Sequence, residues 1–353
     1  MKMLYIGFGR AHASVDGVYV RGLRQNGVEV IDYFFPQKSF VRYGQLLSAY
    51  RKHRGAIDIL CVGYASPLAV IFLRFLSWKR IIYNALCSEY ERKIVSRSLY
   101  KRRYPAFWYH VYYWLADICA CWCANVIMVE SAHQKAFFER KFFVPSHKII
   151  VAWTGADDAL FAYNPHIQKF DTFTVLFRGR LLPEAGGEVV VRAAKLLEEN
   201  GIRVLMLSNG VELPKITRLI EECKPRNLEL HTEYLSSGEL MTCMQRCHIS
   251  LGQLSGHSRL QRTIPHKAYE SLALKVPYLT ARNEGIMEIL REGDTCIACN
   301  PDDPGDLAEK ILWARDHPTE CGAIGEMGYR LYQTRFTPRI LVQVLLQELQ
   351  ERF

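Results

Sequence analysis

Short apolar segments alternate with longer helical patterns along this chain, and this alternation restricts the possible folds more than any other feature of the sequence. In the first half, such segments occupy residues 3–7, 28–33, 57–62, 80–84, 126–130 and 149–153. Short runs rich in Val, Ile and Leu are typical of strands buried on both faces, with helices as the crossovers between them. The pattern predicts a parallel sheet covered on both faces by helices.

The same pattern starts again after a polar link at 162–171. Further strands are expected at 172–177, 204–207, 228–231, 249–251, 278–280 and 296–298, with helices at 188–200, 213–223, 237–246 and 306–315. A chain of 353 residues is too long for one ordinary core. We expect an α/β protein of two tandem Rossmann-like, doubly wound domains, at 1–165 and 166–335, and a C-terminal helix at 336–353 that packs back across the pair.

Charge is distributed unevenly between the two halves. Residues 1–165 contain 22 Lys and Arg against 11 Asp and Glu, whereas residues 166–353 contain 23 against 25. Basic and aromatic residues are concentrated at 92–114, which suits an anionic membrane surface or a phosphorylated lipid. A solvated helix with its aromatic face in the core explains the same residues equally well. Nucleic-acid binding is not expected, because no nucleic-acid motif accompanies the basic residues.

The cysteines and the apolar segments indicate a reduced, cytoplasmic protein. Eleven cysteines are scattered without a disulfide framework, and the chain opens on a strand-like segment with no signal peptide before it. An apolar run at 111–129 approaches the length of a membrane span, but Asp117 and Asn125 interrupt it, so we expect a buried helix followed by a buried strand. The spacing of Cys and His predicts no metal site.

A cation and a carboxylate stand at one expected helix start in the second half. Pro265 suits the first turn of a helix, and Lys267 and Glu270, three residues apart, then project side by side near its positive end. Such an end binds anions, so that the lysine suits a phosphate and the glutamate suits sugar hydroxyls. On spacing alone, an ordinary amphipathic helix with both side chains in solvent is the favoured alternative.

Two glycine-rich loops also follow expected strands. The loop that contains Gly179, Arg180 and Gly186 precedes a helix and forms a second anion cradle, where Arg180 could add a bond of roughly 1.5–3 kcal/mol to a phosphate. The opening loop contains Gly9, Arg10 and His12. Since a dinucleotide fingerprint requires Gly or Ala at the position of His12, this loop suits the approach of a second substrate better than a nicotinamide cofactor.

Four segments, in the right order along essentially the whole chain, resemble motifs of the family 4 glycosyltransferases of the GT-B fold. The turn at 179–186 resembles G-R-L-x-x-E-K-G, and residues 264–273 resemble I-P-N-K-x-Y-E-A-L-A. Residues 154–161 are similar to N-G-V-D-x-x-x-F, and residues 292–308 resemble E-D-G followed by G-D-P-x-x-L-A. The resemblance implies transfer of a sugar from a nucleotide donor with retention, donor binding mainly in the second domain, and no metal or other cofactor.

The resemblance also assigns roles to residues of the expected site. Arg180 and Lys267 would hold the donor diphosphate, Glu270 would hold ribose or sugar hydroxyls, and these three would carry the catalysis. His266 occupies the position of the family's Asn and would contact the donor. At two positions the sequence differs from the family: Ala185 replaces the lysine of the turn, and Arg262 replaces the first acid of an E-x7-E pair. Arg262 is either a phosphate contact or an exposed loop arginine.

On the acceptor side, Arg10, His12, Glu89 and Glu91 could orient or deprotonate a hydroxyl, although a single His or Glu on a loop is more often structural. The expected protein is a retaining glycosyltransferase of the hexosyltransferase type, at the inner face of the membrane. It would add a sugar to a glycan or lipid-linked acceptor in surface polysaccharide or glycolipid biosynthesis. The alternatives are a nucleotide-sugar epimerase and a degenerate GT-B protein that serves as the non-catalytic partner of a transferase.

Overall fold

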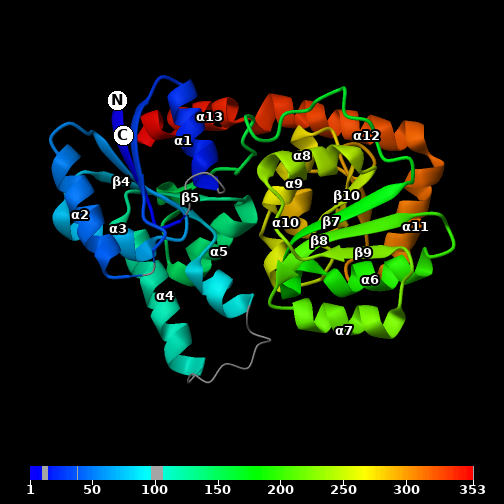
Figure 1. The fold of residues 1–353 in the computed structure, drawn as a ribbon. Coiled ribbons are helices and arrows are strands. Elements are labelled where there is room, and N and C mark those ends of the chain that lie inside the picture. The colour runs from blue at the N-terminus through cyan, green and yellow to red at the C-terminus, as the bar shows by residue number, and fades with distance from the viewer. Residues whose placement is uncertain (10–14, 38, 97–105, 353) are drawn as a thin grey trace. The chain divides into compact units, whose positions relative to one another are not determined.

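The computed structural model describes residues 1–9, 15–37, 39–96 and 106–352, with the side chain of Ala106 left out (Figure 1). The chain forms two compact units: unit 1 comprises Met1–Asp157 and Phe336–Phe353, and unit 2 comprises Asp158–Arg335. Each unit has one six-stranded sheet in which all neighbouring strands are parallel. A strand overlaps each of the twelve expected ranges, and the predicted fold of two doubly wound domains is confirmed.

Unit 1 has the strand order β2-β1-β3-β4-β5-β6. Its strands are β1 (Lys2–Gly7), β2 (Glu29–Phe34), β3 (Ile59–Val62), β4 (Arg80–Leu86), β5 (Val126–Val129) and β6 (Ile149–Val151), and its helices are α1 (Val15–Gln25), α2 (Val41–His53), α3 (Pro67–Leu76), α4 (Ala106–Cys123), α5 (Ala132–Phe142) and α13 (Pro338–Arg352). Leu4 and Ile6 of β1 belong to the core beneath α2, α3, α4 and α5, whereas Met3 and Tyr5 belong to the core beneath α1 and α13. This alternation buries both faces of the sheet, as the apolar strands require.

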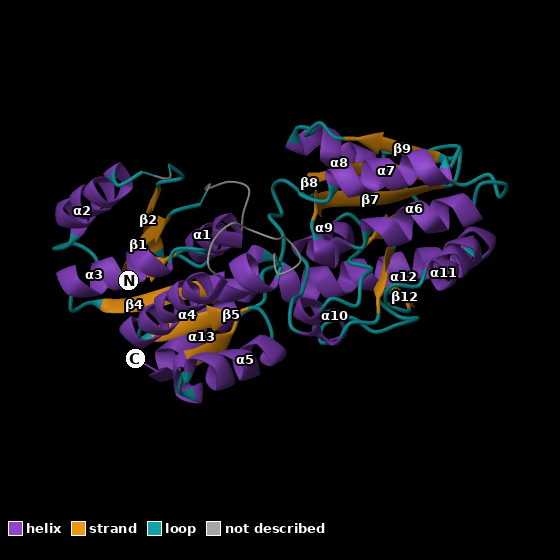
Figure 2. Ribbon diagram, turned by 90° about the horizontal axis from the view of Figure 1, so that it is seen from below, coloured by secondary structure: helices purple, strands orange, loops and turns teal. Residues whose placement is uncertain are grey.

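Unit 2 has the strand order β12-β11-β10-β7-β8-β9. Figure 2 labels β7, β8, β9 and β12 of this sheet. Its strands are β7 (Thr174–Leu181), β8 (Arg203–Gly210), β9 (Leu228–His231), β10 (Ile249–Leu251), β11 (Tyr278–Ala281) and β12 (Ile297–Cys299), and its helices are α6 (Gly187–Leu196), α7 (Leu213–Cys223), α8 (Ser237–Arg246), α9 (His266–Ala273), α10 (Glu284–Met287), α11 (Pro304–Asp316) and α12 (Pro318–Leu331). The chain proceeds outward from β7 on one side and from β10 on the other. The strand order therefore reverses between β7 and β10, and ligands of such sheets bind at the carboxyl ends of the strands there.

The C-terminal helix completes the core of unit 1. Val342 and Leu345 of α13 pack in one cluster with Tyr19 and Leu23 of α1. The two helices approach closely at Gly22, where an added β-carbon would overlap the carbonyl oxygen of Pro338. Along the chain, the boundary between the two units falls after Asp157, whereas the sequence placed it after residue 165.

The apolar run at 111–129 is a helix end followed by a strand, as expected, but the helix is not buried throughout, because Tyr112, Leu115 and Trp122 are exposed. It comprises the last part of α4 and the whole of β5. Asp117 is buried and accepts hydrogen bonds from the backbone N–H groups of Glu89 and Tyr90, at 3.2 and 2.8 Å. Within the described ranges, no helix is both long enough and apolar enough to cross a membrane.

The contact of α1 with α13 predicts opposite effects for two glycine substitutions in unit 1. Gly22→Ala should lower the free energy of unfolding by about 1–3 kcal/mol, because the new methyl group must displace α13. Gly44→Ala, in an open position on α2, should raise it by about 0.5–1 kcal/mol. Urea denaturation followed by circular dichroism measures both. Equal effects of the two substitutions would contradict the close approach of the helices.

Candidate functional site

A buried ion pair joins β7 to α9 at the carboxyl end of the unit 2 sheet. The Arg178 guanidinium donates to the Glu270 carboxylate, and the side chains are only 9% and 12% exposed. Lys267, one turn earlier on α9, donates through Nζ to the Gly252 carbonyl oxygen at 3.4 Å and lies 4.8 Å from the centre of the Phe177 ring. Lys267 and Glu270 thus face the protein at the strand end instead of extending into solvent. We call Arg178, Lys267 and Glu270 the charge cluster.

The charge cluster holds more positive than negative groups. Burial, followed by the nearby Arg178 guanidinium, lowers the pKa of Lys267 to about 7, although the Glu270 carboxylate opposes the shift. Burial also lowers the pKa of His266, whose Nε2 lies 3.7 Å from Glu270 Oε1. Arg178 Nε is buried and has no hydrogen-bond acceptor among the described residues. An anion placed here would be attracted by Arg178, by Lys267 and by the start of α9, and this Nε–H of Arg178 could donate to it. Among the residues of the charge cluster, only the Glu270 carboxylate would repel it.

Gly179 and Arg180 continue β7 past the charge cluster. Gly179 has a φ of +111°, which favours glycine, and a β-carbon added to it would lie 4.0 Å from Lys267 Cε. Arg180 is exposed and pairs in register with Asn209 of β8. The two residues and Arg178 border a cavity of about 210 Å³. The strand end therefore connects the charge cluster to a hollow large enough for part of a small ligand.

The sequence analysis missed most of the residues that line this cavity. They come from the end of β8, from the loop between β9 and α8, and from the first half of α8: Leu207, Ser208, Asn209, Thr232, Glu233, Tyr234, Leu235 and Leu240. Ser208 is buried, and its hydroxyl has no hydrogen-bond partner within the described structure. The available signal was the polar pair Ser208-Asn209 directly after an apolar strand, since parallel strands bring their carboxyl ends to one edge.

The glycine-rich turn at residues 179–186 packs closely against the loop after β10. Gly186 has a φ of +75°, and a β-carbon there would lie 2.8 Å from the backbone nitrogen of Ser255. Glu184 is buried and forms an ion pair with Arg259 at 2.5 Å. Ala185, at the position of the family's lysine, is also buried. Arg262 follows the short 3-10 helix Ser258–Gln261 and is half-buried, so it is not a fully exposed loop arginine.

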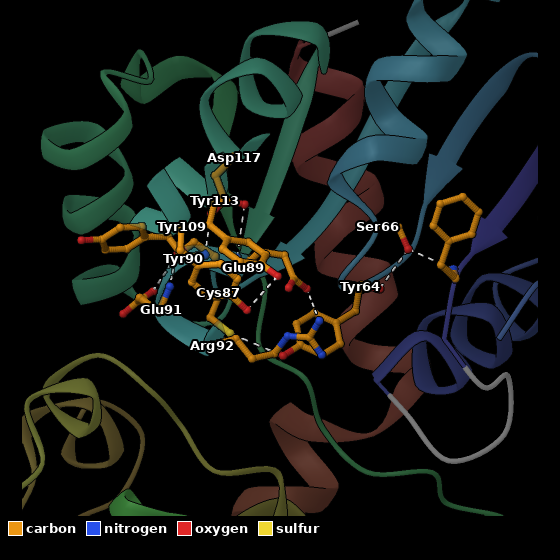
Figure 3. Close-up of polar contacts among 12 residues, drawn as sticks. Tyr64, Ser66, Cys87, Glu89, Tyr90, Glu91, Arg92, Tyr109, Tyr113 and Asp117 are labelled. Atoms are coloured by element: carbon orange, nitrogen blue, oxygen red, sulfur yellow. Dashed lines mark hydrogen bonds and ion pairs between the residues drawn. The ribbon is translucent and has the colours of Figure 1, made fainter. Parts of the chain in front are cut away.

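In unit 1, charged and aromatic side chains gather at the carboxyl end of β4 (Figure 3). The Glu89 carboxylate is buried and forms an ion pair with Arg92, whose guanidinium lies 5.5 Å from the centre of the Tyr64 ring. Burial raises the pKa of Asp117 to about 7, although backbone hydrogen bonds from Tyr90 and Glu89 lower it. Asp117 therefore fixes the loop that carries Glu89.

The structure describes two of the four other residues expected on the acceptor side, Glu91 and Gly9. Glu91 is fully buried and accepts hydrogen bonds from the Gln134 amide and, at 3.3 Å, from the Ser88 hydroxyl, so its carboxylate faces the interior. Gly9 directly follows Phe8 after β1 and has open space around it. Arg10 and His12 lie outside the described residues.

The backbone of unit 1 is strained at the same edge of the sheet. Ala65 and Leu86, after β3 and at the end of β4, have φ values of +61° and +56°. Non-glycine residues seldom adopt this conformation, and such outliers concentrate at functional sites. The strain and the Glu89–Arg92 pair together mark a second candidate site, within unit 1. In the described ranges, no group of three or more His, Cys, Asp or Glu side chains could hold a metal ion.

In comparisons with known proteins, part of the second unit matches a family model, and the whole chain is similar in fold to solved structures. Residues 164–331 match the family described as Glycosyl transferases group 1. None of the curated proteins compared with this sequence matches it. Three solved structures illustrate the likeness in fold.

Anabaena Alr3699/HepE in complex with UDP and glucose has a TM-score of 0.73 at 14% identity, covering 99% of this chain and 100% of that one. Sucrose-phosphate synthase from Thermosynechococcus elongatus has a TM-score of 0.77 at 12% identity, covering 99% and 98%. A glycosyltransferase from Rickettsia africae has a TM-score of 0.68 at 13% identity, with the same coverage.

The charge cluster predicts that Lys267 destabilises the ligand-free protein. Between about pH 7 and its ordinary pKa of 10.5, the unfolded chain carries a proton on Lys267 that the folded protein lacks. The free energy of unfolding of the wild type should therefore rise with pH across this window. Lys267→Met should remove that rise and stabilise the protein by roughly 1–3 kcal/mol near pH 7.

Urea denaturation of the wild type and of Lys267→Met at several pH values tests this expectation. Lys52→Met, at an exposed lysine of α2, serves as the matched control and should change neither the stability nor its pH dependence. A Lys267→Met protein that is less stable than the wild type near pH 7 would show that the lysine is structural.

Proposed function

We propose that this glycosyltransferase of the GT-B fold, with its group 1 domain at residues 164–331, transfers a sugar with retention from a nucleotide-sugar donor bound in unit 2. The charge cluster carries the proposal, because it places an excess of positive charge at a helix start beside the strand-order reversal. The HepE structures hold UDP with glucose and UDP-glucose, which supports a uridine diphosphate sugar as the donor.

The cations act on the leaving diphosphate. Cleavage of the glycosidic bond builds negative charge on the diphosphate and positive charge on the sugar. Lys267, Arg180 and the start of α9 would stabilise the departing phosphate more strongly than the ground state, and this difference lowers the barrier. A phosphate beside Lys267 also raises the pKa of the amine, so that Lys267 becomes charged when the donor binds.

Glu270 would hold the donor's hydroxyl groups. One carboxylate oxygen, Oε2, accepts a hydrogen bond from the Arg178 guanidinium. The other, Oε1, lies 3.7 Å from His266 Nε2, which is a longer contact. A ribose or sugar hydroxyl could donate to Oε1 without breaking the buried ion pair. The ion pair thus positions the carboxylate, and Arg178 is a positioning residue for Glu270.

On the acceptor side, the reaction needs no protein nucleophile. In a retaining transfer of this kind, the acceptor hydroxyl attacks from the face that the diphosphate leaves, and a phosphate oxygen takes its proton. Glu89 and Arg92 of unit 1 would orient the acceptor. That acceptor would be a glycan or a lipid-linked carrier at the inner face of a membrane. No metal is required, because the cationic side chains supply the charge that a metal would otherwise provide.

Glu270→Ala should abolish both donor binding and transfer. Incubation with a panel of nucleotide sugars, followed by donor hydrolysis and thermal stabilisation, measures the response. We expect the variant to lower kcat/KM for the best donor by at least about 100-fold. Glu222→Ala, at an exposed glutamate of α7, should respond as the wild type does.

Because Glu270→Ala also leaves the buried Arg178 without its carboxylate, Glu270→Gln provides a variant of the same shape. A folded Glu270→Gln protein with wild-type activity would refute the role of the carboxylate. Donor binding by the wild type without turnover on any acceptor would instead support the non-catalytic partner, which the buried Ala185 also favours.

A further inference from the structure

Large aromatic side chains project into solvent from α3, α4 and the loop after α3. Trp78 is 98% exposed and Phe75 is 84% exposed. Along α4, four apolar side chains are exposed with spacings of four, three and seven residues, which places them on one side of the helix: Trp108, Tyr112, Leu115 and Trp122. We call these six residues the aromatic face.

The end of α3 that carries Phe75 lies beside the end of α4 that carries Trp122. Arg74, near the end of α3, donates through Nε to the carbonyl oxygen of Cys123, at the end of α4, over 2.7 Å. Helices α3 and α4 pack side by side (Figure 1). Lys148 lies 5.7 Å from the Trp122 ring centre and donates to the Trp122 carbonyl oxygen at 3.2 Å. A cation therefore lies over the Trp122 ring.

The segment that contains α2, α3 and the loop after α3 is rich in basic residues. Between residues 33 and 88, the sequence contains eight Lys and Arg, and Asp58 is the only acidic residue. Arg51, Lys52 and Arg54 are exposed at the end of α2. Lys79 next to Trp78 donates through Nζ to the Ile57 carbonyl oxygen at 2.5 Å, which ties the loop after α3 to the loop after α2. The protruding aromatic residues thus lie beside a cationic edge.

These observations fit a lipid surface better than a protein partner. Trp and Tyr prefer the interface between lipid headgroups and acyl chains, where a ring is buried while its polar edge stays hydrated. Side chains that protrude as far as Trp78 can enter a fluid interface, whereas a protein partner would need a matching pocket for each of them. Cationic residues at the same level attract anionic headgroups.

We propose that the aromatic face docks unit 1 on an anionic lipid bilayer, with Phe75 and Trp78 among the headgroups and the end of α2 over the lipid phosphates. This inference rests on the proposed function in one respect, because it names the surface that would bring the enzyme to a lipid-linked acceptor. It does not depend on catalysis, because vesicle binding and donor binding are measured separately. Its effect would be to hold the enzyme where a lipid-carried acceptor is concentrated.

Sedimentation of the full-length protein with vesicles tests the proposal. Vesicles of equal parts phosphatidylglycerol and phosphatidylcholine should bind the wild type, and vesicles of phosphatidylcholine alone should bind it much more weakly. The double variant Phe75→Ser/Trp78→Ser should bind the anionic vesicles at least about tenfold more weakly. Arg51→Gln/Lys52→Gln/Arg54→Gln should bind more weakly and lose much of its dependence on salt.

Phe40→Ser is the matched control, because Phe40 is 92% exposed and precedes α2, at the opposite end from Arg51, Lys52 and Arg54. It should bind vesicles as the wild type does. All variants should keep their melting temperature and their thermal response to nucleotide sugars. Equal vesicle binding by the wild type and the Phe75/Trp78 variant would overturn the proposal. Self-association of the wild type in light scattering that the same variant abolishes would also overturn it, in favour of a protein interface.

Discussion

The ion pair between Arg178 and Glu270 is the interaction on which the proposed donor site of this protein depends. Two charges buried this deeply remain stable only while each compensates the other. The pair connects the first strand of unit 2, next to the strand-order reversal, with the helix that carries Lys267. Burial, followed by the nearby Arg178 guanidinium, lowers the pKa of Lys267, and the Glu270 carboxylate, which is already paired with Arg178, opposes the shift only in part. In the function proposed here, an anion completes this site.

Unit 1 uses its charged groups differently. Its carboxylates are largely satisfied by the protein itself: Glu91 by Gln134 and Ser88, and Asp117 by the backbone of the loop after β4. The Glu89–Arg92 pair follows β4, directly after the strained backbone of Leu86. Arg51, Lys52 and Arg54 are exposed at the end of α2. The charges of unit 2 thus suit a small anion, whereas those of unit 1 suit positioning and an extended anionic surface.

The strands were predictable because each is an apolar run between helical patterns, and helices α7 and α8 begin and end where the sequence placed them. The adjacency of Lys267 and Glu270 followed from helical spacing. Arg178 was missed because it lies within an apolar strand, although a charged residue there requires a buried partner. Neither its pairing with Glu270, 92 residues later, nor the orientation of Glu91 toward Gln134 is encoded locally. Long-range partners of this kind depend on how the chain returns to the same edge of the sheet.

The central claim is that the donor diphosphate supplies the negative charge that the charge cluster lacks, and proton uptake during binding tests it most directly. Calorimetric titration with UDP-glucose near pH 8, in two buffers of different ionisation enthalpy, measures that uptake. The wild type should take up nearly one proton per donor bound, roughly the fraction of Lys267 that is neutral at that pH. Lys267→Arg, which is always charged, should bind the donor with no such uptake. Donor binding by the wild type without proton uptake, or with the same uptake in Lys267→Arg, would contradict the account.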